Sequence, residues 1–276
     1  MSPDSRIPVA KQVAAQGVTT SAATECPVCS SKRRELFQAT LLRKYEVHYF
    51  LCETCGLIQT EQPYWFNEAY SSAIADADTG LVSRNLEIAR KLAGLLYFSF
   101  DPNAQFLEAA GGYGLLTRVM RDRGFDFRWH DPYCENIFAR GFEWDPVNGT
   151  AKGGAVTAFE VLEHVTDPID FIRKALAQAK TRTIVFSTLL YEGKPPRPEE
   201  WWYYSLESGQ HISFFRKDTL NILAGKLGLR LYTHGSFHVL TDAALNEMVF
   251  RICTSRLSVF VDTYVQMRLK SKSPRS

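Results

Sequence analysis

Four of the six cysteines in the chain form two C-x2-C pairs, a spacing typical of metal sites. The pairs are Cys26 with Cys29 and Cys52 with Cys55, and 22 residues separate them. Four thiolates complete a tetrahedral zinc site, which is structural because it leaves no position open for water. A redox role for one pair would require a thioredoxin-like context, which the sequence does not offer. We therefore predict a zinc-binding segment over residues 25–65.

A second group of residues has the types and spacing needed to bind a nucleotide. Gly112 and Gly114 lie in FLEAAGGYG, residues 106–114, directly after a short apolar stretch. Glycines at this place let the backbone approach a ligand closely, and the helix expected next offers free N–H groups. Asp131 follows nineteen residues after Gly112, where a carboxylate can accept both hydroxyls of a ribose. The pattern predicts an adenosine-like ligand.

The residues around the glycines distinguish between kinds of nucleotide. A dinucleotide loop continues with a third glycine, but Thr117 occupies that position. Glu108 precedes the glycines, and a carboxylate there suits a cationic ligand such as the amino group and sulfonium of S-adenosylmethionine. The alternative is that Glu108 is a surface acid at a strand end and that the glycines form an ordinary turn.

Further acidic, imidazole and aromatic side chains cluster in two stretches. In FEVLEHV, residues 159–165, Glu160 stands at an expected strand end and is a candidate for the cofactor side, and His164 is a candidate catalytic group. Four adjacent aromatic residues, 201–204, lie in an expected loop. They would either form the wall of a substrate pocket or pack onto the sheet.

The elements that must position these residues alternate along the chain. Strands are expected at 104–109, 125–131, 155–161 and 182–188, and helices at 81–98, 115–124, 167–179 and 216–228. Two more β-rich stretches, 229–240 and 246–253, are expected to form a final pair. This alternation predicts an α/β fold with a doubly wound, mostly parallel sheet of seven strands and an antiparallel edge strand. A small zinc-ribbon-like segment precedes it.

Composition and charge limit the classes of function. Hydrophobic residues make up 45% and charged residues 22%, as in ordinary globular proteins, and the net charge of +2 gives no reason to expect nucleic acid or a membrane as a partner. No secretory leader is apparent, so a cytoplasmic location is expected. We predict a flexible tail at 1–24, the zinc-binding segment, a main domain at 66–262 and a basic tail at 263–276. The sequence does not indicate an oligomeric state.

Taken together, three motifs resemble those of class I S-adenosylmethionine-dependent methyltransferases. They are FLEAAGGYG, HDPY at 130–133 and the stretch AVTAFEVLEHVTDPIDFIRKA at 155–175. The family's acid-x-Gly-x-Gly-x-Gly loop is represented by Glu108, Ala110, Gly112 and Gly114, with alanine in place of the first glycine. The resemblance implies that these four residues and Asp131 bind the cofactor. The cysteine pairs resemble a zinc domain that precedes the catalytic domain in sugar C-methyltransferases, although their C-terminal domain is missing here.

The resemblance also implies a reaction and a candidate base. His211 matches a histidine that lies near the transferred methyl in related enzymes, and a neutral imidazole can take a proton from a hydroxyl group. A purely structural histidine is the alternative for His211, and His164 is a second catalytic candidate behind His211. We expect direct in-line methyl transfer to a small molecule, for which a sugar or sugar nucleotide is one candidate. Two rival functions are a nicotinamide-dependent oxidoreductase and a non-catalytic zinc-ribbon interaction module.

Overall fold

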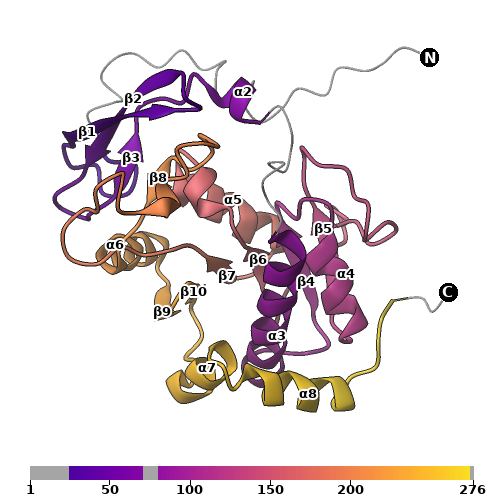
Figure 1. Ribbon diagram of the computed structural model, residues 1–276. Coiled ribbons are helices and arrows are strands. Elements are labelled where there is room, and N and C mark those ends of the chain that lie inside the picture. Colours follow the sequence, from indigo (N-terminus) through magenta and orange to yellow (C-terminus); the bar gives the residue numbers. More distant parts are fainter. Residues whose placement is uncertain (1–24, 71–79, 274–276) are drawn as a thin grey trace, which may run out of the picture. The chain divides into compact units, whose positions relative to one another are not determined.

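The chain folds into two compact units, each built from separate parts of the sequence (Figure 1). The computed structural model describes residues 25–70 and 80–273. The first unit comprises residues 25–70, 160–171 and 188–227, and the second comprises residues 80–159, 172–187 and 228–273. The tail predicted at 1–24 lies outside the described residues.

The second unit contains a six-stranded sheet with the order β5-β4-β6-β7-β10-β9. Its strands are β4 (Gln105–Ala109), β5 (Asp126–His130), β6 (Val156–Ala158), β7 (Thr183–Ser187), β9 (Arg230–His234) and β10 (Phe237–Thr241). The pairs β4–β5, β4–β6 and β6–β7 are parallel. Every residue of β6, β7 and β10 is buried, as expected for central strands covered on both faces.

The sheet has six strands rather than the seven predicted, and beyond β5 the described residues add only a single bridge. Trp129 of β5 forms an isolated parallel bridge with Glu143. Its N–H donates to the oxygen of Phe142, and its oxygen accepts from the N–H of Trp144, both at 2.8 Å. Pairing ends there because the chain turns at Asp145, whose carboxylate accepts from the N–H groups of the two residues that follow Pro146.

The end of the sheet also differs from the prediction. Both final strands come from the stretch 229–240, and β10 is antiparallel to β7 and to β9. The antiparallel strand is therefore second from the edge, and β9 forms the edge. The stretch 246–253, predicted as a strand, lies in helix α7 (Glu247–Thr254). The side chain of Asn246 caps this helix by accepting from the N–H groups of Met248 and Val249.

Helices of the second unit supply the rest of its core. They are α3 (Leu81–Ser99), α4 (Leu115–Asp122), α5 (Pro168–Ala179, whose first turn belongs to the first unit), α7 and α8 (Ser258–Arg268). The predictions at 81–98, 115–124 and 167–179 are thus confirmed. Helix α3 packs against α4, α7 and α8. The basic tail predicted from 263 begins too early, because α8 continues to Arg268. None of the described helices is both long and apolar enough to cross a membrane.

The first unit is built around a four-stranded antiparallel sheet with the order β1-β2-β3-β8. Its elements are β1 (Arg34–Leu41), β2 (Tyr45–Leu51), β3 (Ile58–Thr60), α2 (Phe66–Ala69), η1 (Leu162–His164), η2 (Trp202–Tyr204), β8 (Ser213–Phe214) and α6 (Lys217–Leu227). Strand β8 pairs Phe214 with Ile58, so the cysteine-bearing segment shares its sheet with residues from late in the chain. The predicted boundary at residue 65 therefore does not mark an independent domain.

Candidate functional site

The glycine loop of the second unit connects β4 to α4, and three of its residues have left-handed backbone. Ala110 has φ of 55°, Gly112 has φ of 53° and Gly114, which precedes α4, has φ of 83°. Ala110 thus adopts the conformation that suits the glycine it replaces in the family motif, at a cost of about 1 kcal/mol. A Cβ on Gly111 would lie 2.8 Å from the Trp129 ring, so the close packing here requires glycine. The sequence pattern did not indicate this role of Gly111.

Asp131 and Trp129 hold the loop in place from the neighbouring strand. The Asp131 Oδ2 accepts from the N–H of Gly112 at 2.9 Å, and Oδ1 accepts from the N–H groups of Tyr133 and Cys134 at 2.8 and 3.0 Å. The indole of Trp129 donates to the Gly112 oxygen at 2.9 Å. The Asp131 carboxylate is thereby fixed beside the loop while its oxygens keep further lone pairs for a ligand.

Glu108 lies beneath the loop and binds the start of α4. It is 6% exposed, and its Oε2 accepts from both the N–H, at 2.8 Å, and the hydroxyl of Thr117. Burial raises the pKa of Glu108 to about 7, although the hydrogen bonds from Thr117 oppose the shift and the charge of Asp131 adds to it. Thr117, which seemed only to interrupt a dinucleotide motif, is the partner of this acid.

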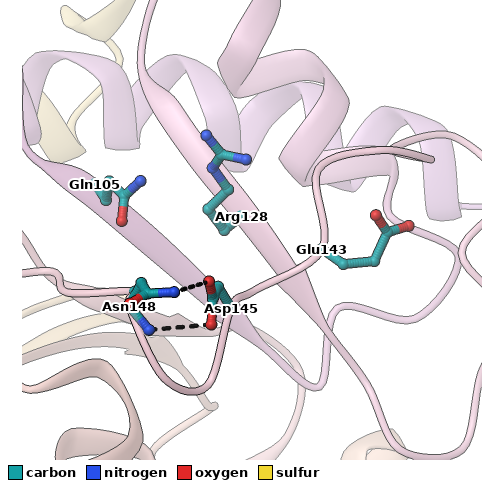
Figure 2. A pocket seen from close by; sticks show the side chains of 6 residues that line it. Gln105, Arg128, Glu143, Asp145 and Asn148 are labelled. Carbon is teal, nitrogen blue, oxygen red and sulfur yellow. Dashed lines mark hydrogen bonds between the residues drawn. The ribbon is translucent and has the colours of Figure 1, made fainter.

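A cavity of about 220 Å³ lies elsewhere in the second unit and contains none of the predicted site residues (Figure 2). Its lining includes Gln105, Arg128 and Glu143, together with Asp145, which accepts from the N–H and side-chain amide of Asn148. Gln105 begins β4, whereas ligands of such sheets bind at the carboxyl ends of the strands. We therefore do not assign the cofactor to this cavity.

In the first unit, Glu163 of η1 forms a buried polar cluster with Tyr203 and His211. The Tyr203 hydroxyl donates to Glu163 Oε1 at 2.8 Å, and the His211 Nδ1 lies 2.7 Å from the Tyr203 carbonyl oxygen. The other carboxylate oxygen, Glu163 Oε2, is buried with no hydrogen-bond partner. Since the carbonyl oxygen can only accept, Nδ1 of His211 carries a proton and Nε2 is left with a free lone pair.

His164 joins the same cluster. Its Nδ1 lies 3.0 Å from the Gln210 carbonyl oxygen and 2.9 Å from the Tyr70 hydroxyl, and its ring centroid is 4.8 Å from that of His211. Glu160 lies four residues earlier, with φ of 54°, which is a strained conformation for a residue with a side chain.

Burial and mutual charge shift the pKa values in this cluster in opposite directions. Burial raises the pKa of Glu163 to about 7, and the Glu160 carboxylate contributes to the rise. Burial lowers the pKa of His211 to about 4 and also lowers that of His164. Both imidazoles are therefore neutral at pH 7 in the protein as it stands.

The aromatic stretch 201–204 is mostly part of the core of the first unit. Tyr203 and Tyr204 are 3% and 1% exposed, and the Tyr204 ring packs edge-on against Tyr49 and Phe214. Only Trp202, at 76%, is largely exposed. Of the two interpretations left open by the sequence, packing applies to the two tyrosines, and Tyr203 also contacts the histidine cluster.

The four cysteines of the first unit converge. The Sγ atoms of Cys26 and Cys55 lie 3.5 Å apart, those of Cys29 and Cys52 lie 3.3 Å apart, and all four are within 4.8 Å of one another. Tetrahedral zinc with bonds of about 2.3 Å requires sulfur separations of about 3.8 Å, so the group fits the ion. After each pair the chain turns through a left-handed residue, Ser30 with φ of 63° and Gly56 with φ of 78°.

The structure thus gathers the predicted residues into three groups. Glu108, Ala110, Gly112, Gly114 and Asp131 meet at the glycine loop of the second unit. In the first unit, His164 and His211 meet in the histidine cluster, with Glu160 close enough to influence Glu163, and the cysteines form a separate cluster. Sequence reasoning missed the roles of Thr117, Trp129, Tyr203 and Tyr70, for which only a polar or aromatic type was visible.

The mostly parallel sheet, with its glycine loop at the carboxyl end of β4, defines a Rossmann-like α/β protein. The family model described as "Methyltransferase domain" matches residues 83–234. This match covers more than half of the chain, which therefore belongs to the methyltransferase-domain family. No curated protein matches the sequence.

Solved structures similar to this chain include several methyltransferases. An O-methyltransferase family 2 protein from Planctomyces limnophilus in complex with apigenin is 16% identical, with 63% of each chain covered and a TM-score of 0.45. Magnesium protoporphyrin IX methyltransferase from Synechocystis with bound SAH is 12% identical, with 63% of this chain and 90% of that chain covered and a TM-score of 0.40. TnmH is 20% identical, with 64% of this chain and 60% of that chain covered and a TM-score of 0.44. The chain thus spans less than two thirds of the length of TnmH and of the apigenin-bound protein.

Proposed function

We propose that the protein transfers a methyl group from S-adenosylmethionine to a small-molecule acceptor. The observation that carries the proposal is the Asp131 carboxylate, held against the N–H of Gly112 at the carboxyl ends of β4 and β5 in a member of the methyltransferase-domain family. A carboxylate in this position suits the two ribose hydroxyls, and the adjacent glycines admit close approach of the ligand.

The remaining loop residues are proposed to shape the cofactor site. Gly112 and Gly114 allow the backbone to follow the ligand, and Ala110 maintains the turn in a left-handed conformation. Glu108 acts mainly through its bonds to Thr117, which fix the start of α4. We propose Glu160 as a further cofactor-side acid on the strength of its place directly after the end of β6.

Methyl transfer itself requires the acceptor oxygen to lie about 3 Å from the methyl carbon and in line with the breaking bond. The oxygen forms a bond to the methyl carbon while the carbon–sulfur bond breaks, leaving S-adenosylhomocysteine. The acceptor hydroxyl loses its proton in this step. We propose that this proton leaves by way of the histidine cluster, with the free Nε2 of His211 as the first candidate base and His164 as the second. A sugar or sugar-nucleotide acceptor is a narrower form of the proposal.

We also propose that the four cysteines bind a structural zinc ion. The sulfur separations and the burial of Cys26, Cys52 and Cys55 fit a closed site. When bound, the ion joins the two turns of the first unit and contributes to the stability of that unit.

Isothermal calorimetry with S-adenosylmethionine, S-adenosylhomocysteine and NADH tests the cofactor assignment. We expect both sulfur ligands to bind and Asp131→Ala to weaken each by about tenfold or more, through the loss of hydrogen bonds to the ribose. Binding of NADH alone would favour an oxidoreductase. Binding of none of the three would favour a non-catalytic interaction module.

The role of His211 is tested once an acceptor is in hand. His211→Asn is expected to lower kcat by about 100-fold or more while leaving the affinity for S-adenosylmethionine unchanged. His234→Asn, in β9 of the second unit, is the control. Unchanged turnover in His211→Asn would show that His211 is structural.

A further inference from the structure

We infer that Glu163, His164 and His211 form a binding site for a divalent first-row transition-metal cation, separate from the four cysteines. One potential ligand atom from each of the three residues lies within 4.8 Å of the others. All three belong to the first unit, where η1 carries Glu163 and His164 and the segment before β8 carries His211. The backbone N–H of Ile212 donates to the backbone carbonyl oxygen of Glu163 at 2.8 Å, which fixes these two segments together.

The imidazoles are oriented as metal ligands commonly are. Each directs Nδ1 to a backbone carbonyl oxygen, that of Gln210 at 3.0 Å for His164 and that of Tyr203 at 2.7 Å for His211. Metal-binding histidines typically donate their second ring N–H to a carbonyl or carboxylate in this way. The hydrogen bonds that these two rings form within residues 25–70 and 80–273 all use Nδ1, so each Nε2 presents a lone pair when Nδ1 carries the proton.

The carboxylate provides a second, independent indication of a ligand. Glu163 is fully buried, its Oε1 accepts from Tyr203, and its Oε2 has no hydrogen-bond partner. A buried carboxylate oxygen without a partner is costly, and coordination to a cation is one of the few ways to satisfy it. The hydrogen bond from Tyr203 to the other oxygen matches the outer bonds that orient ligating carboxylates.

The donor set indicates the class of ion. Two neutral imidazoles and one carboxylate suit Mn²⁺, Fe²⁺, Co²⁺ or Zn²⁺ and leave coordination positions open. Mg²⁺ and Ca²⁺ prefer sites formed by oxygen ligands. The cysteine cluster offers four thiolates, which disfavour Mn²⁺, so Mn²⁺ distinguishes the two sites.

An ion at this site would change how the acceptor loses its proton, and this consequence rests on the proposed methyl transfer. An ion held by Glu163, His164 and His211 would keep open positions, and a water or hydroxyl group bound at one of them would have a lowered pKa. His211 would in that case act as a ligand rather than as the proton acceptor.

The binding test uses the full chain with its zinc content measured, and it follows free Mn²⁺ by electron paramagnetic resonance. We expect about one Mn²⁺ per chain, and at least tenfold weaker binding in Glu163→Gln and in His211→Asn. The control is His48→Asn, because His48 forms a pair with Glu35 at 3.1 Å and has no third ligand. Circular dichroism and calorimetry with S-adenosylmethionine report whether each variant is folded.

Two results would overturn the site. One is wild-type protein that binds no Mn²⁺ below about 1 mM, and the other is binding that survives in both variants. These outcomes are separate from failure of the proposed function, which calorimetry with the cofactor detects. If the Glu163 variant does not fold, His164→Asn supplies the same measurement through a half-buried residue.

Discussion

Replacing Glu108 by glutamine should change how the stability of the second unit depends on pH. The buried carboxyl has a pKa of about 7 instead of 4.5. The folded state therefore holds the proton more tightly than the unfolded state, and ionisation destabilises the fold. Stability falls as the pH rises from 4.5 to 7, and the loss is complete above pH 7. The pKa of Glu108 differs by about 2.5 between the folded and unfolded states, and a pKa change of one corresponds to about 1.36 kcal/mol. The free energy of unfolding therefore falls by about 3 kcal/mol over the whole transition.

Glu108→Gln removes the charge and keeps an oxygen that can accept from both Thr117 groups. The assay is urea unfolding of the ligand-free protein at pH 5, 6, 7 and 8, followed by circular dichroism. The variant should gain stability relative to the wild type by about 2.5 kcal/mol between pH 5 and pH 8, because part of the full change lies below pH 5. Glu207→Gln, whose side chain is 85% exposed, is the control and should not alter the pH dependence. Parallel curves for the wild type and Glu108→Gln would refute the reasoning.

Three further changes test the loop and the cysteine cluster. Ala110→Gly should stabilise the ligand-free second unit by about 1 kcal/mol, seen as a higher urea midpoint, because φ of 55° suits glycine; an unchanged or lower midpoint would contradict this. Gly114→Ala should destabilise it by about 1–3 kcal/mol, since φ is 83° and a Cβ would lie 2.7 Å from Asn136 Oδ1; an equal midpoint would show that the loop relaxes. Cys52→Ser should lower the zinc content below that of the control Cys134→Ser in metal analysis, and equal content would exclude the four-thiolate site.

Local patterns were sufficient for the elements that carry the cofactor loop. The strand ending at Ala109, the glycines after it and the acid at the end of β5 were all visible as a short apolar run, a turn composition and a spacing. These features could be predicted because each is encoded by contiguous residues. The hydrogen bonds between Glu108 and Thr117 could not be predicted, because they depend on how the turn closes.

One element was mispredicted because a cap and tertiary packing decided between a strand and a helix, and one stretch could not be predicted at all. The stretch 246–253 is apolar and β-branched enough for a strand, but the Asn246 cap and the burial of Phe250 and Cys253 on one face select a helix. The stretch 132–150 carried no clear prediction, and in the structure the turn at Asp145 limits its pairing with β5 to one bridge.

The sequence by itself determined the family motifs, the two cysteine pairs and the alternation that yields a mostly parallel sheet, because these depend on residue type and short spacing. Only the tertiary structure placed β8 beside β3 and joined Glu163, His164 and His211 in one cluster. It also showed that one oxygen of Glu163 is buried without a partner. These features arise from contacts between residues far apart in the chain, for which neither periodicity nor spacing provides a signal.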